Sequence, residues 1–306
     1  SISKGHDELM LEIGANDGIL LRQLAEMGYN NLYAIDPSPQ TRVLDIPNIQ
    51  IINDFFNNTS VAELPKHGFS KIIANNCLSH IPDLVSVLAL CKNLLRSDGI
   101  LIVEIQSTLD LIEGVIFDYI YHEHYFYHTV TSFSEVARLS GLELFAVKHV
   151  NTKGGSYRLL LGVPGIHKKD GSVEYWKYRE GIANIHTTKP WLAIENYLQK
   201  IKQSLHEILQ IKKKLNVVAY GASATGTVFL RYMEIEEAIA WIVDDNLKRQ
   251  GRFSPGVGIP VQSPSTCTSA DLCIILAWRH SKHITPKLNS LGVPYVLPLP
   301  ALSFHG

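Results

Sequence analysis

The chain has 306 residues, a length that predicts two domains. Apolar residues make up 46% of it and charged residues 19%, which is typical of an ordinary soluble globular protein. The 28 basic and 29 acidic side chains give a formal net charge of −1, and this balance argues against a nucleic-acid-binding protein, which needs a basic face.

In the first half of the chain, short apolar runs alternate with longer amphipathic ones. The short runs predict buried strands, and the longer runs predict helices, several of which end on glycine. Such an alternation predicts a parallel sheet with crossover helices. Strands are expected at 8–14, 31–37, 49–54, 70–76 and 99–105, and helices at 17–28 and 84–99.

Two further strands, at 142–150 and 156–163, are separated only by a short turn, NTKGG. They predict a hairpin, so the last strand should run antiparallel to the others. Five parallel strands that end in a hairpin indicate an α/β fold of the Rossmann-like, class I S-adenosylmethionine-dependent methyltransferase type, more than a plain dinucleotide-binding fold.

The character of the sequence changes after the hairpin. It is helical and amphipathic with a break at Pro190, and then the α/β rhythm restarts at Asn216. The predicted organisation is a methyltransferase domain at 1–165, a helical linker at 166–215 and a smaller Rossmann-like α/β domain at 216–306.

The first predicted strand-to-helix turn carries a glycine loop, EIGANDG (12–18). Glycine lets the backbone approach a ligand, but the loop lacks the G-x-G-x-x-G spacing of a pyrophosphate site. Its two acids and its amide suit the ammonium and sulfonium groups of S-adenosyl-L-methionine. The alternative is that these side chains only cap helices. The candidate cofactor-binding residues of the loop are Glu12, Gly14, Asn16, Asp17 and Gly18.

Two later strand ends extend this candidate cofactor site. Asp36 follows the second strand, about twenty residues after the loop, where a carboxylate can accept hydrogen bonds from both ribose hydroxyls of an adenosine. After the third strand, Asp54 is expected to bind the exocyclic amine of adenine and Phe55 to stack on the ring. A structural role as a cap is the alternative for Asp54.

The four cysteines, Cys77, Cys91, Cys267 and Cys273, form no C-x-x-C pair, which argues against a cysteine zinc site. They are typical of core residues in a reducing compartment. No apolar run reaches the roughly 18 residues of a membrane span, and no signal peptide is visible. We therefore expect a cytoplasmic protein without a membrane or nucleic-acid partner.

The segment FDYIYHEHYFYH (117–128) concentrates three histidines and four tyrosines. An H-E-x-x-H zinc motif fails, because Phe126 stands where the second histidine belongs. His122 and His124 could still share one face of an extended segment and take His128 as a third ligand. A purely structural stretch of packed rings is the other alternative, and we predict no metal.

Several segments together resemble one family. EIGANDG, NNCLSHIPD (75–83), FDYIYHEHYFY (117–127) and KGGSYR (153–158) resemble the sugar C-methyltransferases of deoxysugar biosynthesis. GASATG (221–226) and the sequence after it resemble the C-terminal domain of the same family. The resemblance covers nearly the whole chain, in order.

This resemblance implies an enzyme that uses S-adenosyl-L-methionine to methylate a ring carbon of a nucleotide-linked sugar, commonly next to a keto group. In the family, a histidine of the Y-x-E-H segment removes the proton alpha to the carbonyl, and the resulting enolate attacks the methyl group. Carried over, the base is His124, with Tyr121 and Glu123 beside it, and His80 is a second candidate. Histidine titrates near neutral pH, as such a base should.

The remaining candidates come from the same motifs. His122 and His128 are expected to be structural. Cofactor binding is assigned to Asn75 and Asn76, and substrate binding to Lys153, Ser156, Arg158 and Ser223, with Arg279 as a further candidate for a phosphate contact.

Two departures from the family concern the substrate. Family members usually begin with a small cysteine-rich zinc domain, and this sequence shows none. Lys153 also stands where the family commonly has histidine. The alternative function is therefore methylation of a different small molecule or of a carrier-bound substrate.

The loop GASATG is a near miss to two motifs. Ser223 replaces the middle glycine of the dinucleotide fingerprint, and Thr225 stands where G-x-S-x-G needs glycine. An NAD-dependent oxidoreductase, a serine nucleophile and a binding protein with a degenerate site are the remaining alternatives. By resemblance, this domain helps to hold the nucleotide part of the substrate.

Overall fold

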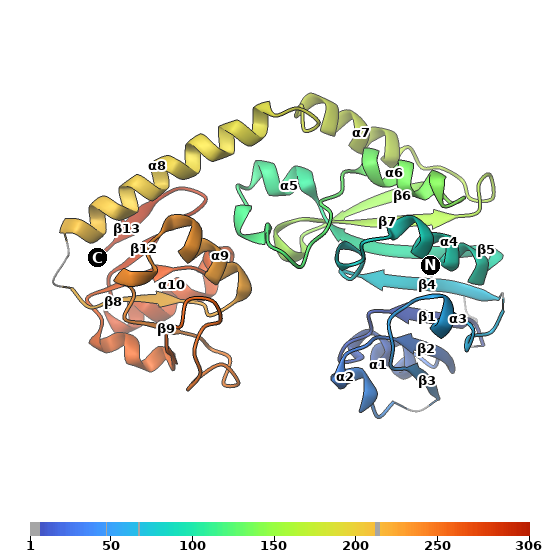
Figure 1. Cartoon of the computed structure of the whole chain (residues 1–306), viewed down its shortest axis with the longest axis horizontal. Helices are drawn as coiled ribbons and strands as arrows, with labels where there is room; N and C mark the ends of the chain where they lie inside the picture. The colour runs from blue at the N-terminus through green and yellow to red at the C-terminus, as the bar shows by residue number, and fades with distance from the viewer. Residues whose placement is uncertain (1–6, 47, 67, 212–214) are drawn as a thin grey trace. The chain divides into compact units, whose positions relative to one another are not determined.

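The computed structural model describes residues 7–46, 48–66, 68–211 and 215–306. The chain forms two compact units (Figure 1). The first unit consists of the chain up to Asp110 together with His122–His186. The second consists of Leu111–Tyr121 and Thr187–Gly306, so a short piece of the first half of the sequence belongs to the second unit.

Within the described residues, the first unit contains a seven-stranded sheet in the order β3-β2-β1-β4-β5-β7-β6. Strands β1 to β5 pair in parallel, and β7 pairs antiparallel with both β5 and β6. The predicted class I methyltransferase sheet and its hairpin are confirmed. The strands are β1 (Leu9–Ile13), β2 (Asn31–Ile35), β3 (Ile49–Ile52), β4 (Phe69–Asn75), β5 (Leu95–Gln106), β6 (Glu143–Val150) and β7 (Ser156–Gly162).

The helices of this unit include two that the sequence predicts, α1 (Ile19–Glu26) and α4 (Leu84–Leu94). Helix α4 is shorter than the predicted 84–99, because Leu95 is extended and pairs with Phe69 of β4. The other elements are α2 (Pro39–Arg42), α3 (Asn58–Val61), η1 (Leu78–His80), α6 (Val130–Leu139), η3 (Thr152–Gly154) and α7 (Ser172–Ile182), and α5 (Thr108–Glu113) runs from this unit into the second.

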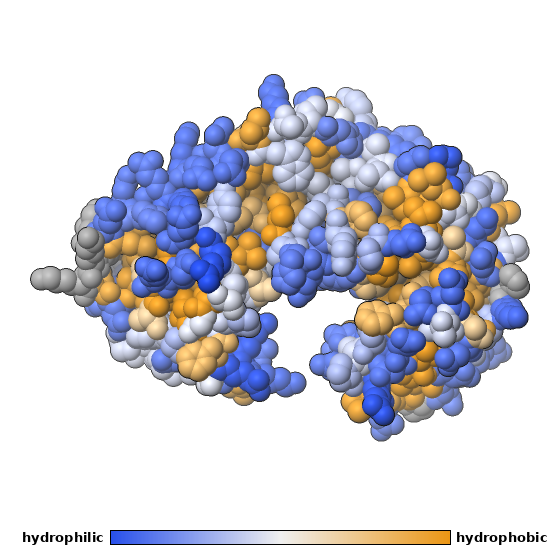
Figure 2. Space-filling model, viewed as in Figure 1, coloured by the Kyte–Doolittle hydropathy of each residue, from blue (hydrophilic) through white to orange (hydrophobic). Residues whose placement is uncertain are grey.

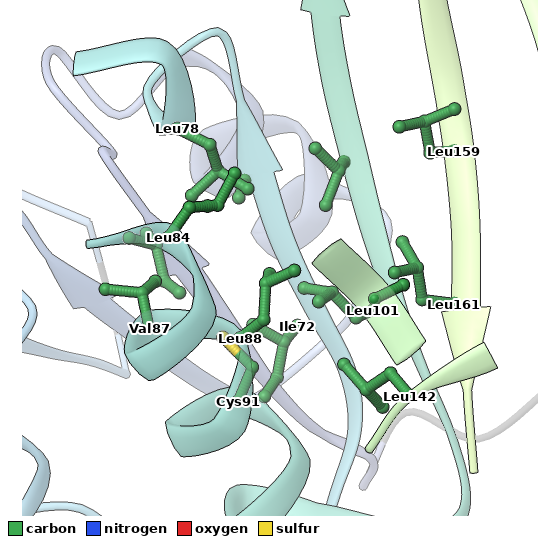
Figure 3. Close-up of a cluster of buried hydrophobic side chains, with 14 of the residues drawn as sticks. Ile72, Leu78, Leu84, Val87, Leu88, Cys91, Leu101, Leu142, Leu159 and Leu161 are labelled. Atoms are coloured by element: carbon green, nitrogen blue, oxygen red, sulfur yellow. The ribbon is translucent and has the colours of Figure 1, made fainter. Parts of the chain in front are cut away.

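Apolar side chains cover both faces of the first sheet. Met10 packs with Leu21 of α1, whereas the next residue, Leu11, belongs to a core with Leu88 of α4 and Phe133 of α6. Figure 3 shows this second core, in which side chains of α4 lie against those of the strands. Because both faces are covered, the strand ends are where a ligand can reach this sheet.

The second unit is also an α/β fold, with a sheet in the order β10-β9-β8-β11-β12-β13. All its neighbours pair in parallel except β12 and β13. The predicted second Rossmann-like domain is present, with two short strands, β10 and β13, that the sequence does not indicate. The strands are β8 (Val217–Tyr220), β9 (Trp241–Val243), β10 (Val261–Gln262), β11 (Leu272–Ile275), β12 (Tyr295–Leu297) and β13 (Ser303–His305).

The helical elements of the second unit precede its strands in the sequence or connect them. They are η2 (Phe117–Tyr119), α8 (Lys189–Ile211), α9 (Ala224–Met233), η4 (Glu236–Ala238), η5 (Pro264–Ser269), η6 (Trp278–His280) and α10 (Ser281–Leu291).

The predicted helical linker at 166–215 is divided between the units. Helix α7 belongs to the first unit and α8 to the second. The predicted break at Pro190 lies at the start of α8, because Pro190 is its second residue and proline is tolerated in the first turn of a helix. Helix α8 buries Leu198, Ile201 and Leu205 on one stripe, and the side of α8 in view in Figure 2 is largely hydrophilic. The boundaries of the units therefore differ from the predicted 1–165, 166–215 and 216–306, since α7 and α8 of the predicted linker each belong to a folded unit.

Two further findings concern the chain as a whole. The four cysteines are free. Among the described helices, none is both long enough and apolar enough to span a bilayer.

Candidate active site

The glycine loop after β1 is fixed by its neighbours. The amide of Gly14 donates to the Ile35 carbonyl oxygen over 2.8 Å, and Gly14 has a φ of +76°. A Cβ atom at Gly14 would lie 2.7 Å from Cβ of Cys77. Position 14 therefore admits only glycine, and the loop lies directly against the turn that follows β4.

Asp36 fixes the same loop from the end of β2. Its two carboxylate oxygens accept hydrogen bonds from the amides of Asn16, at 3.0 Å, and Ser38, at 2.6 Å. The hydroxyl of Thr41 donates to the Asn16 carbonyl over 2.7 Å. A carboxylate offers about four acceptor positions, so Asp36 keeps capacity for the hydroxyls of a ribose.

Glu12 has a different environment from the other acids of the loop. It is 5% exposed, and among the described residues its Oε2 atom is buried without a hydrogen-bond partner. Burial first, and then the charges of Asp17 and Asp36, raise the pKa of Glu12 to about 8. An orphaned acid of this kind fits a cationic ligand, which would compensate its charge. Asp17 is exposed, and Gly18, at φ +69°, is the N-cap of α1.

The end of β3 carries the predicted adenine site. Asp54 and Phe55 are exposed, and the Phe55 amide donates to Oδ1 of Asp54 over 2.7 Å. The Phe55 ring is 69% exposed, so its faces are accessible for stacking. Asn53 links this end to the Asp36 turn, because its amide donates to the carbonyl oxygens of Asp36 and Ser38.

His80 is positioned by the turn after β4. The thiol of Cys77 donates to the Ile13 carbonyl at 3.2 Å, and Cys77 is the N-cap of the turn η1, which ends at His80. Nδ1 of His80 lies 2.9 Å from the carbonyl oxygen of Glu123. Since a carbonyl can only accept, Nδ1 carries the hydrogen, and Nε2 of a neutral His80 is left as a proton acceptor.

The two predicted histidines lie together. The rings of His80 and His124 have centroids 5.0 Å apart, and the ring of Tyr127 lies edge-on to His124 at 5.7 Å. The amide of Tyr125 donates to the Ser79 carbonyl over 2.8 Å, which joins the loop after β5 to the turn after β4. These contacts all lie within the first unit.

The other residues of the segment have distinct places. The side chain of Glu123 is exposed, and its backbone carbonyl, not its carboxylate, contacts a histidine. Tyr121 is the last residue of Leu111–Tyr121, which clusters with the second unit. His122 is exposed, whereas His128 is buried beside Phe133, and burial lowers the pKa of His128 to about 4. The described residues contain no group of three or more His, Cys, Asp or Glu that could hold a metal ion.

Glu104, at the end of β5, binds several polar side chains, and it is not among the residues predicted from the sequence. It is buried and accepts hydrogen bonds from Arg158 at 2.8 Å and Thr152 at 2.9 Å. Burial would raise the pKa of Glu104, but these hydrogen bonds outweigh it and hold the pKa below its usual range. Asn76 lies 3.4 Å from the same carboxylate, so its amide supports Glu104, while the neighbouring Asn75 is half-buried at the end of β4. A lone carboxylate in an apolar strand at the ligand edge was the signal that could have indicated it.

The loop before β7 presents Lys153, and Gln106 donates to the Lys153 carbonyl oxygen over 3.3 Å. Desolvation lowers the pKa of Lys153, although Glu104 and Cys77 oppose this shift. Ser156 is fully buried and donates to the Thr152 carbonyl, so its hydroxyl closes the turn. Its assignment to the substrate stays a prediction.

Two candidates lie in the second unit. Ser223 caps α9, because its hydroxyl oxygen accepts a hydrogen bond from the Gly226 amide at 3.1 Å. Arg279 is paired with the buried Asp118 at 2.5 Å. The guanidinium that the sequence suggests for a phosphate contact therefore neutralises a carboxylate in this structure.

The chain is similar in sequence to known methyltransferases. Sequence models of two families match, one described as a methyltransferase domain over residues 5–147 and one as a C-methyltransferase C-terminal domain over residues 151–300. The C-methyltransferase NovU of Streptomyces niveus is 24% identical and aligns with 96% of this chain and 72% of its own length.

Solved structures also match the chain over about half its length. A methyltransferase from Aquifex aeolicus, described as S-adenosylmethionine-dependent, covers 52% of this chain and 85% of its own, with 15% identity and a TM-score of 0.40. The 1,6-didemethyltoxoflavin-N1-methyltransferase of Burkholderia thailandensis covers 54% of this chain and 72% of its own, with 19% identity and a TM-score of 0.39.

The fold, the loop after β1 and the two family matches define an S-adenosyl-L-methionine-dependent methyltransferase that acts on carbon. The chain carries the two domains that these models describe, a methyltransferase domain and a C-methyltransferase C-terminal domain, and the predicted resemblance to a C-methyltransferase family is confirmed at that level.

Proposed function

We propose that the protein methylates a ring carbon next to the keto group of a nucleotide-linked sugar. The observation that carries the proposal is the pairing of His80 with His124 at 5.0 Å between ring centroids, at the carboxyl edge of the sheet. The turn that ends in His80 begins at Cys77, which lies against Gly14 of the cofactor loop. A base and a methyl donor would therefore act side by side.

The cofactor supplies an electrophilic methyl group. We assign its binding to the residues at the ends of β1, β2 and β3, with Glu12 opposite its cationic groups, Asp36 on the ribose and Phe55 on the adenine. The orphaned Oε2 of Glu12 supports this assignment, because a buried acid without a partner is stabilised by a bound cation.

Histidine His124 would take the proton from the carbon alpha to the ketone. The C–H electron pair would move into the enolate, and the enolate carbon would then form a bond to the methyl group while the methyl–sulfur bond breaks and its electron pair stays on the sulfur of the leaving thioether. Since His80 carries its hydrogen on Nδ1, its Nε2 can accept a hydrogen bond from a protonated neighbour or from a sugar hydroxyl. Tyr121 is proposed as the donor to the enolate oxygen, as the sequence predicts.

The nucleotide part of the substrate is assigned to the second unit, and Lys153 with Arg158 to the sugar side. The support for this division is the match of residues 151–300 to a C-methyltransferase C-terminal domain. We expect the protein to act in the cytoplasm, where its four free cysteines stay reduced.

Ligand binding tests the proposal first. A ligand that binds only the folded state raises the melting temperature. We expect S-adenosylhomocysteine and nucleoside-diphosphate keto-sugars to raise it, and NAD to leave it unchanged. A shift with NAD alone would contradict the proposal and favour an oxidoreductase.

Substitution of His124 tests the base. His124→Gln should abolish methyl transfer to keto-sugars while S-adenosylhomocysteine binding, measured by calorimetry, stays within about twofold. The matched control is His122→Gln, two positions away and exposed, which should keep most of the activity. Near-normal turnover of His124→Gln would remove His124 from the mechanism. Binding of S-adenosylhomocysteine without product from any keto-sugar would instead favour another small-molecule or carrier-bound substrate.

A further inference from the structure

The segment Leu111–Tyr121 lies between two parts of the first unit in sequence but packs within the second. Its short turn η2 contacts α9 through aromatic rings. The ring of Phe117 is 6% exposed and lies 4.8 Å from that of Tyr232 and 5.8 Å from that of Phe229, between centroids. These packed rings hold the segment on the second unit.

A buried ion pair lies beside these rings. Asp118 has no exposed side-chain surface, and its carboxylate accepts hydrogen bonds from Arg279 at 2.5 Å and from the Trp278 indole at 3.2 Å. The guanidinium of Arg279 also lies over the ring of Tyr119, 4.5 Å from its centroid. Arg279 therefore contacts two consecutive residues of the segment.

This arrangement is sensitive to the loss of one partner. Burial raises the pKa of Asp118, and the charge of Arg279 opposes that rise. Removal of Arg279 would leave a carboxylate with no exposed surface and without its counter-charge, a state that is strongly unfavourable in a protein interior. The segment would then have to move until Asp118 reaches water or takes up a proton.

The next residues of the chain form the loop that carries the proposed base. This loop runs from His122 to Tyr125, and its far end is held in the first unit by the hydrogen bond from the Tyr125 amide to the Ser79 carbonyl. Its near end follows directly from Tyr121, the last residue of the segment. The base is thus three residues from a segment held on the second unit and one residue from an anchor in the first.

We infer that Arg279, through its ion pair with Asp118, is a positioning residue for the loop that carries His124. The inference rests on the proposed function for the role of His124. It assigns to the C-terminal α/β unit a part in the chemistry that differs from binding the nucleotide. Arg279 itself touches no reacting atom in this account.

Two measurements test the inference separately from the proposed function. The first is hydrogen exchange of the amides of residues 117–128 in the full chain, which needs no substrate. Arg279→Met should raise their exchange rates at least tenfold, and Arg279→Lys should restore part of the protection because it keeps the charge. The control is Ile284→Val, which removes one buried methyl group from the core under α10 and leaves the ion pair intact.

The second measurement is turnover with nucleoside-diphosphate keto-sugars. Arg279→Met should lower kcat by tenfold or more with a smaller change in the KM for S-adenosyl-L-methionine, and Ile284→Val should change neither. Unchanged exchange at 117–128 in Arg279→Met overturns the inference, as does equal deprotection in Ile284→Val. If the wild-type protein shows no turnover, the proposed function fails, and the exchange data still decide whether Arg279 holds the loop.

Discussion

Glu12 and Asp36 lie at the ends of neighbouring strands, but they differ in whether their carboxylate oxygens have hydrogen-bond partners. The oxygens of Asp36 hold the amides of Asn16 and Ser38, so this carboxylate organises the loop with or without a ligand. Glu12 has a buried oxygen without a partner in the described part of the chain, and its pKa is raised to about 8. Its ionisation should therefore respond to the arrival of a cation.

This difference predicts a pH-dependent cofactor affinity. Below about pH 8, Glu12 is largely protonated without the cofactor, and a bound cation favours the carboxylate, so binding should release up to one proton. The affinity for S-adenosyl-L-methionine should then rise with pH up to about 8, by about tenfold per unit at most.

Calorimetry in two buffers with different ionisation enthalpies measures the released protons directly. Glu12→Gln should bind more weakly at pH 8 and lose the pH dependence, because an amide does not titrate. Asp17→Asn, at an exposed neighbour, should keep it. An affinity of the wild-type protein that stays constant between pH 6 and 8 would contradict this prediction.

At the level of elements, the loop between β6 and β7 is fixed by the end of β5 and the start of α5. Gly155 has a φ of +131°, and a Cβ atom there would lie 2.3 Å from Cγ of Asp110. Asp110 is itself held by Nε2 of His149, 3.0 Å from each carboxylate oxygen. The carboxylate and the glycine together set the path of the loop that presents Lys153.

Substitution of three glycines by alanine should separate the cost of a positive φ from the cost of a steric clash at the added Cβ atom. Gly155→Ala is expected to destabilise the protein by about 2 kcal/mol, from positive φ and collision with Asp110. Gly165→Ala should cost about 1 kcal/mol, since its φ is +79° but no atom lies within 4 Å. Gly181→Ala, inside α7 with open space around it, should stabilise by about 0.5–1 kcal/mol. Urea unfolding of the three variants measures this order, and a Gly155→Ala variant as stable as the wild type would refute it.

The elements that the sequence predicts well are those with a strong local pattern. The apolar runs at β1 to β5 and the hairpin of β6 and β7 give the sheet, because a buried parallel strand needs a continuous apolar stretch. Helix α6 was missed, although Thr129 and Ser132 form a capping box at its start. Its buried residues Val130, Phe133 and Ala137 also have helical spacing, so both local signals of this helix are present in the sequence.

The candidate site was predictable where a motif lies at a strand end. His80 and His124 follow neighbouring parallel strands, whose ends lie at the same edge of the sheet, and their rings lie 5.0 Å apart. The partners of Ser156 and Arg279 could not be predicted, because they depend on tertiary contacts, one across a turn and one with Asp118, 161 residues away. A polar residue in a motif does not reveal whether its hydrogen bonds are already used.

At the scale of the whole molecule, the two sheets repeat one strand-loop-carboxylate arrangement. Asp244, after β9, accepts hydrogen bonds from the amides of Ala222 and Asn246, at 2.8 Å each, as Asp36 does from Asn16 and Ser38. The sequences of the two loops differ, but in both an aspartate at a strand end accepts hydrogen bonds from two backbone amides. Arg249 pairs with Asp244 at 2.9 Å, and this cation distinguishes the second loop from the first.

The repeat allows each site to serve as the control for the other. Asp36→Asn should weaken S-adenosylhomocysteine binding by about tenfold or more, because its loop loses a hydrogen-bond acceptor. The affinity for nucleoside diphosphates should not change. Asp244→Asn should do the reverse if the second unit holds the nucleotide. Both affinities can be measured by calorimetry, and a loss of S-adenosylhomocysteine binding in Asp244→Asn would argue against independent sites.

The place of Leu111–Tyr121 has a consequence for the order in which the chain folds during synthesis. Asp118 leaves the ribosome long before Arg279, since 161 residues separate them. The ring of Phe117 has no partner from α9 until Phe229 is synthesised, and the carboxylate of Asp118 lacks its counter-charge until Arg279 is synthesised. The second unit cannot be completed from the last third of the chain alone, so cutting the gene at any single point between the units would separate a buried acid from its base. Contacts this distant in sequence form late and slowly, and the loop of the proposed base would be among the last parts of the enzyme to be set.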